Sequence, residues 1–318
     1  MIRLLGVIAG AAAGTAAVAL GLVFSQSPDV SPGAGLDFSA ASAGEMPAPV
    51  AVPMRDGFPL QVRRYPRAEG PLVVLVHGSG WHGLQFWRLA PLLAERAEVL
   101  VPDLRGHGGQ PGRRGDVDYI GQLEEDLADL IAAYGEGRKV VLAGHSSGGG
   151  LVVRFAGGAN GALADRAVLM APFLNHAAPT TRPNSGGWAR PLVRRIIGLT
   201  MLNAVGVRAL NHLPVITFAF PARVLEGPLG DTATRSYSYR LNTSYAPRSD
   251  YKRDIAALPP FLLMAGAEDE AFVAEGYEAL MSPLNAKGTY RVVPGVGHLG
   301  IVDAPETAAA MRELLRGL

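Results

Sequence analysis

Ser146 lies in the stretch VVLAGHSSGGG, where an apolar run ends in two serines enclosed by glycines. Residues 144 to 148 read G-x-S-x-G, directly after a predicted strand and just before a predicted helix, GLVVRFAGG. Small flanking residues let the backbone turn sharply and present a serine hydroxyl at the end of the strand. The placement predicts a nucleophile, although a turn that merely joins strand to helix would explain an isolated match.

A serine hydroxyl needs a base to accept its proton and a carboxylate to orient that base. Asp269 follows a predicted strand in MAGAEDEAF, and His298 follows the last predicted strand in VPGVGHLGIV. Along the chain these residues come in the order Ser, Asp, His, which is the order expected when the nucleophilic serine lies on a strand–turn–helix motif of this kind. Taken singly, Asp269 could cap a helix and His298 could shape a loop, and the flanking Glu268 and Glu270 are alternative acids.

Acyl transfer also needs hydrogen-bond donors for a developing oxyanion. The backbone N–H groups of Ser147, next to the predicted nucleophile, and of Ser79, in HGSGW, are expected to supply them. We expect His77, His107 and His145 to be structural.

These residues follow short apolar runs that alternate with helical patterns from Val50 onward, which indicates an α/β protein with a mainly parallel sheet flanked by helices. The predicted strands include PLVVLV, AEVLVPD, RAVLM, PFLLMAG and TYRVV. The carboxyl edge of such a sheet is where ligands bind.

Composition narrows the function classes further. The 318 residues are 48% hydrophobic, and 29 Lys and Arg balance 28 Asp and Glu, which excludes the strong positive field of a nucleic-acid-binding protein. Cysteine is absent, so thiolate catalysis and Cys-ligated metals are excluded. No cofactor is implied.

The N-terminus, residues 1–24, is a predicted membrane anchor or signal segment. Leu4 to Phe24 is an uncharged apolar run long enough to span a bilayer as a helix. Arg3 precedes this run and acidic residues follow it, so the catalytic domain is expected outside the cytoplasm, on the periplasmic or extracellular side. The alternative is a secreted protein cleaved near ASAG, residues 41–44. Residues 25–49, rich in Ser, Pro, Gly and Ala, are a predicted flexible linker.

The strand–helix alternation stops after Pro172 and resumes near Ile255. We therefore divide the remaining chain into a first segment of the hydrolase core, residues 50–172, an inserted helical cap, residues 173–254, and a second core segment, residues 255–318. The cap contains a nearly all-apolar stretch, and Leu192 to Leu202 is expected to contact the acyl chain of a substrate. Contact with the bilayer, or packing of the cap on its own core, would also account for it.

From Val50 to Leu318 the chain resembles the α/β-hydrolase superfamily, and more narrowly its branch of monoacylglycerol lipases, lysophospholipases and serine aminopeptidase-like proteins. The motifs that carry the likeness are VLVHGSGWHG, VPDLRGHGGQPGRRGDVDYIGQLEEDL, GHSSGGG, GAEDEAF and PGVGH. The resemblance implies that Ser146, Asp269 and His298 are nucleophile, acid and base. The sequence departs from the narrower pattern at Ser147, where those lipases usually carry methionine.

Together these patterns predict a serine hydrolase of carboxylic esters with an apolar acyl chain, such as a monoacylglycerol or a lysophospholipid. Two alternatives stay open: an aminopeptidase of the same fold, and a catalytically silent binding protein. The few acidic residues between Phe173 and Tyr251, which are Glu226, Asp231 and Asp250, disfavour a site for a substrate ammonium group.

Overall fold

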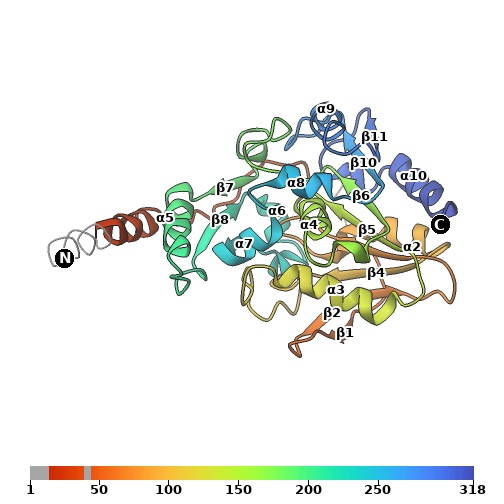
Figure 1. The fold of residues 1–318 in the computed structure, drawn as a ribbon, viewed down its shortest axis with the longest axis horizontal. Helices are drawn as coiled ribbons and strands as arrows, with labels where there is room; N and C mark the ends of the chain where they lie inside the picture. The colour runs from red at the N-terminus through yellow and green to blue at the C-terminus, as the bar shows by residue number, and fades with distance from the viewer. Residues whose placement is uncertain (1–13, 39–43) are drawn as a thin grey trace, which may run out of the picture.

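The computed structural model describes residues 14–38 and 44–318, and its centre is an eight-stranded sheet in the order β1-β2-β4-β3-β5-β6-β10-β11 (Figure 1). All neighbours from β4 to β11 are parallel, whereas β1 and β2 are antiparallel additions at one edge. The strands are β1 (Val50–Pro53), β2 (Pro59–Tyr65), β3 (Leu72–Val76), β4 (Glu98–Asp103), β5 (Val140–His145), β6 (Arg166–Met170), β10 (Phe261–Gly266) and β11 (Gly288–Val293). The predicted mainly parallel sheet is confirmed.

The central strands form because their residues are apolar on both sides. Every residue of β3, β4, β5 and β10 is buried, as a parallel sheet covered on both faces requires. The carboxyl ends of these strands lie along one edge, so the loops that follow them are brought together there.

Helices cover both faces of the sheet. They are α2 (Leu89–Ala94), α3 (Gln122–Tyr134), α4 (Ser147–Ala156), α9 (Gly276–Met281) and α10 (Pro305–Arg316). From β3 the chain crosses through α2 to one side, and from β4 it returns through α3 to the other, so right-handed crossovers place α2 and α3 on opposite faces. Helix α10 packs beside α2, and α4 packs beside α3.

The segment expected to be a helical cap is a mixed structure instead. It contains β7 (Ala189–Pro191), α5 (Val193–Ala204), β8 (Pro214–Phe218), α6 (Ala222–Leu225), β9 (Ser236–Ser238), α7 (Tyr239–Tyr245) and α8 (Tyr251–Ala256). The three strands pair as a small antiparallel sheet, β7-β8-β9. Only part of the apolar stretch is helical, because Pro191 and Pro214 bracket the helix and the β-branched run PVITF forms a strand.

The expected membrane segment lies partly outside the described residues, since these begin at residue 14. Residues 14–24 are helical, and Ala19 and Val23 are buried against Leu199 and Leu202 of α5 (Figure 1). The two helices approach closely at Gly198, where a Cβ atom would lie 2.5 Å from the Ala19 carbonyl oxygen. Within the described part of the chain, no helix has both the length and the apolar character needed to cross a membrane.

The described part of the expected linker, residues 25–38 and 44–49, is not free of the domain. Arg190 donates to the Ser31 carbonyl and pairs with Asp29, and the Gly33 N–H donates to the Phe220 carbonyl. The side chains of Leu36 and Phe38 are buried in the main core. The proline-rich composition suits an extended segment that binds through its backbone carbonyls and a few apolar side chains as well as it suits a flexible tether.

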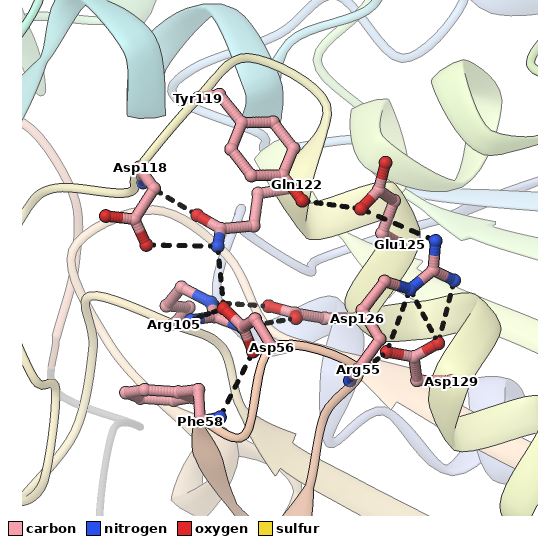
Figure 2. Close-up of polar contacts among 10 residues, drawn as sticks. All are labelled: Arg55, Asp56, Phe58, Arg105, Asp118, Tyr119, Gln122, Glu125, Asp126 and Asp129. Carbon is pink, nitrogen blue, oxygen red and sulfur yellow. Dashed lines mark hydrogen bonds and ion pairs between the residues drawn. The ribbon is translucent and has the colours of Figure 1, made fainter.

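Figure 2 shows a polar network that fixes the loop after β4 to α3 and to the β1–β2 turn. Arg105 donates two hydrogen bonds to Asp126 and two to Asp56, and its guanidinium lies over the Phe58 ring. Gln122 donates to both Asp56 and Asp118. The network accounts for the Asp-Leu-Arg-Gly-His-Gly motif structurally, because its arginine holds the loop after β4, in which His107 contacts the Tyr237 hydroxyl.

Candidate active site

The predicted nucleophile sits on a strained turn between β5 and α4. Ser146 has φ 54° and ψ −121°, a conformation that non-glycine residues rarely adopt. The glycines of the motif are required sterically: a Cβ on Gly144 would lie 2.3 Å from the Gly148 carbonyl oxygen, and one on Gly148 would lie 2.2 Å from that of Val76. The local sequence thus permits a tight elbow that leaves the serine at the carboxyl edge of the sheet.

Three residues predicted from separate loops form one hydrogen-bonded chain. His298 Nε2 lies 3.0 Å from Ser146 Oγ, and His298 Nδ1 lies 2.9 Å from Asp269 Oδ2. All three residues are buried. The arrangement has the geometry in which an imidazole can accept a serine proton while a carboxylate orients the ring.

Asp269 is the acid that meets the imidazole. Its other carboxylate oxygen accepts the N–H groups of Ala271 and Phe272 at 2.8 and 2.7 Å. Burial favours its neutral form, but His298 and these hydrogen bonds outweigh burial and lower the pKa of Asp269. Of the alternative acids, Glu268 is exposed, and Glu270 accepts the backbone N–H of His298 rather than its ring.

The two residues expected to donate backbone N–H groups border the same small cavity as Ser146 and His298. Ser147 is the first residue of α4, so its N–H has no partner within the helix. The loop that carries Ser79 is held on both sides of that residue: the Gly78 N–H donates to Gln85 and the Gly80 N–H to the Tyr237 hydroxyl. The Ser79 hydroxyl itself accepts from the Trp188 indole at 3.1 Å.

The other histidines near the site are buried and neutral. Burial lowers the pKa of His77 and of His145 to about 3. The Leu104 N–H donates to His77 Nε2, so Nδ1 carries the proton and donates to the Gly78 carbonyl at 2.8 Å. His145 Nε2 lies 2.9 Å from the His298 carbonyl oxygen. These contacts shape loops, in agreement with the structural role expected of them.

Sequence reasoning missed Trp188 and Tyr237, which support the Ser79 loop. Tyr237 is fully enclosed, and its hydroxyl contacts both the Gly80 N–H and His107 Nε2, the latter at 2.7 Å. Both residues come from the cap, whose sequence carries no local signal for contact with the β3 loop. The one indication in the sequence is that GGW and SYS each place an aromatic residue, Trp188 and Tyr237, in a segment of small residues.

A cavity of about 830 Å³ opens over Ser146 and His298. Its walls are mostly apolar and are formed by residues from the core, the cap and the N-terminal segment: Leu36, Phe38, Trp81, Leu84, Trp188, Phe220, Val224, Leu229, Leu299 and Val302. Among the described residues that line it, Arg223 and Asp303 add charged side chains. Such a cavity suits an apolar ligand with one polar end.

Helix α5 does not line this cavity, so the expectation that Leu192 to Leu202 contacts the acyl chain is wrong. Its inner face packs on the helix of residues 14–24 and on β8, and its other face carries Val193 and Ile197 at 53% and 47% exposure. The cap contributes to the cavity through residues 188 and 220–229 instead. Within residues 14–38 and 44–318, no group of three His, Asp or Glu side chains could hold a metal ion.

The chain belongs to the alpha/beta hydrolase family, whose sequence model matches residues 73–311. The curated relatives share only part of their length with it: the 30 kDa subunit of the magnesium chelatase of Rhodobacter capsulatus is 35% identical over 89 residues, 28% of this chain and 31% of that protein. The matched stretch is too short to carry a whole protein's activity to this chain.

Solved structures extend the likeness to most of the chain at the level of the fold. A bacterial membrane phospholipase A has a TM-score of 0.58 and 20% identity, over 99% of this chain and 96% of that one. A soluble variant of the monoglyceride lipase of Saccharomyces cerevisiae has a TM-score of 0.62 and 16% identity, over 86% of this chain and 97% of that one.

Proposed function

We propose that the protein is a serine hydrolase that cleaves carboxylic esters with an apolar acyl chain through an acyl-enzyme. The observation that carries the proposal is the chain Ser146–His298–Asp269 at the base of an apolar cavity, with distances of 3.0 and 2.9 Å between successive side chains. A silent binding protein would have no need for a strained serine joined to an imidazole and a buried carboxylate.

In the first half of the reaction His298 Nε2 takes the Ser146 proton while Oγ attacks the ester carbonyl carbon. The N–H groups of Ser79 and Ser147 bind the resulting oxyanion. As the tetrahedral intermediate collapses, the bond to the alcohol oxygen breaks and His298 returns the proton to that oxygen. Water, deprotonated by His298, then attacks the acyl carbon, and the acid and free Ser146 result.

The acyl part of the substrate is proposed to be a fatty chain. The apolar cavity walls favour it, since each buried methylene contributes about 0.8 kcal/mol. A monoacylglycerol or a lysophospholipid fits this description, and a membrane phospholipase A and a monoglyceride lipase share the fold.

An aminopeptidase would need a carboxylate free to hold the substrate ammonium group. Among the described residues, Asp303 is the carboxylate that lines the cavity, but burial raises its pKa and Arg88 lies 3.6 Å away, so it is a poor partner for a second cation. The structure therefore favours the ester.

Purified full-length protein in detergent, assayed on acyl esters of graded length, lysophospholipids and aminoacyl anilides, tests the proposal. We expect turnover of esters and loss of turnover in Ser146→Ala. Cleavage of aminoacyl anilides alone would support the peptidase, and no turnover of any substrate would support the binding protein.

We further propose that the N-terminal segment anchors the protein in a membrane, with the hydrolase domain outside the cytoplasm. The apolar run and the position of Arg3 support this arrangement. Mass spectrometry of the mature N-terminus tests it: an intact start supports an anchor, and a start near Gly44 would show a secreted, cleaved protein.

A further inference from the structure

The cavity over Ser146 has a wall that belongs neither to the hydrolase core nor to the cap. Leu36 and Phe38, in residues 25–38, line it together with Ser146 and His298. We call residues 25–38 the N-terminal strap. Both side chains are buried, at 6% and 8% exposure, although the surrounding sequence is rich in Gly, Pro and Ser.

The strap is held in place along its length by the cap. Thr217 Oγ1 donates to the Asp29 carbonyl, Arg235 to that of Val30, and Arg190 to that of Ser31. At Gly35 the strap passes so close to the cap that a Cβ atom there would lie 2.3 Å from the backbone nitrogen of Trp188. The Phe38 ring then packs on Trp188 and Phe220, with centroids 5.6 and 5.7 Å away.

A single carboxylate joins the strap to the catalytic loop. Glu270 accepts the Asp37 N–H with one oxygen, at 3.1 Å, and the His298 N–H with the other, at 2.7 Å. Glu270 follows the acid Asp269, so the strap is tied to the same turn that orients His298.

From these contacts we infer that the N-terminal strap is part of the active site: Leu36 and Phe38 bind the acyl chain of the substrate, and Glu270 holds them in position over His298. The inference rests on the proposed ester hydrolysis and adds a specificity wall supplied by the segment next to the predicted anchor. Removal of the strap would open the cavity on one side and alter which acyl chains are preferred.

The test compares kcat/KM for decanoate and acetate esters in the full-length protein. Phe38→Ala removes a part of the apolar wall that only the decanoyl chain would contact. We therefore expect the decanoate-to-acetate ratio of kcat/KM to fall roughly tenfold, which corresponds to losing the burial of about two methylene groups. Phe24→Ala is the matched control, because Phe24 is 63% exposed on the preceding helix and does not line the cavity. Its ratio should stay within about twofold of wild type.

Glu270→Gln tests the positioning role. A glutamine has one acceptor oxygen, so one of the two hydrogen bonds is lost, and the ratio should fall toward that of Phe38→Ala. The decanoate-to-acetate ratio of the double variant Phe38→Ala/Glu270→Gln should then be little lower than that of Phe38→Ala alone, since both changes disturb the same wall. Glu268→Gln, on the exposed neighbour, should leave the ratio unchanged.

The outcomes separate this inference from the proposed function. If wild type turns over no ester and a fluorophosphonate fails to label Ser146, the proposed function itself is wrong. If wild type is active and labelled but folded Phe38→Ala keeps the wild-type ratio, the strap is not part of the acyl site. Full additivity of the Phe38 and Glu270 effects would show that Glu270 does not act through the strap. Thermal midpoints identify variants that fail to fold.

Discussion

His298 Nε2 lies 3.0 Å from the hydroxyl oxygen of Ser146, although 152 residues separate them in the chain. The pair meets because Ser146 follows β5 and His298 follows β11, and the loops after both strands leave the sheet at its carboxyl edge. The contact is the basis of the first prediction.

Ser146→Ala should lower kcat for a preferred ester by roughly 10⁴-fold or more, because the nucleophile of an interdependent set is removed. Labelling by a fluorophosphonate should disappear while the thermal midpoint stays near that of wild type. Turnover close to wild type in the folded variant would show that another group attacks the ester.

Arg105→Lys should destabilise the fold strongly, by about 2–3 kcal/mol in chemical denaturation. The Arg105 and Asp126 side chains are 6% and 3% exposed, and burial raises the pKa of Asp126 despite the pairing (Figure 2). A lysine ammonium cannot bind both oxygens of the Asp126 carboxylate at once. The variant would therefore leave a buried carboxylate without a full set of hydrogen bonds, which lowers the free energy of unfolding.

Arg55→Lys is the control for that change, since Arg55 pairs with Asp129 beside this network but is 48% exposed (Figure 2). An exposed pair contributes at most about 1 kcal/mol. Equal losses in the two variants would contradict the assignment of Arg105 as the buried centre of the network.

The buried, neutral His145 should make the fold sensitive to acid. Burial lowers its folded pKa to about 3, whereas an unfolded histidine titrates near ~6.5. As the pH falls below ~6.5 the unfolded chain takes up a proton that the folded chain does not, so stability is lost progressively until the pH reaches about 3.

Denaturation of wild type and His145→Gln at pH 7.5 and 5 measures this effect. Glutamine does not titrate, so wild type should lose about 2 kcal/mol more than the variant between the two pH values. His176→Gln, at an exposed position, should change the pH dependence much less. If the difference in the free energy of unfolding between wild type and His145→Gln is the same at both pH values, His145 is not held neutral in the folded protein.

Val224→Asp should depress hydrolysis of long-chain esters much more than that of acetate esters, because Val224 lines the cavity and a carboxylate there opposes an apolar chain. Ile197→Asp should leave the chain-length profile unchanged, since Ile197 lies on the exposed face of α5. Kinetics across a series of acyl lengths, with thermal midpoints, check both variants. A selective long-chain loss in Ile197→Asp would restore α5 as an acyl wall.

The sequence by itself predicted the sheet and the three residues that meet over it. Fully apolar runs such as LVVLV are typical of strands buried inside a covered sheet, and the glycines around Ser146 permit the tight turn found there. The order of strands then requires Ser146, Asp269 and His298 to follow strand ends on one edge. These features are local, or follow from topology, and so can be read without distant contacts.

Tertiary structure alone decided what surrounds those residues. An apolar stretch such as VRRIIGLTMLNA can bury itself against substrate, bilayer or another helix, and the helix of residues 14–24 occupies its inner face. Likewise, the composition of residues 25–38 fits a free tether or a bound strap, and the distinction lies with Arg190, Trp188 and Glu270, far away in the chain. Such contacts depend on two surfaces being complementary, and neither sequence segment encodes the other.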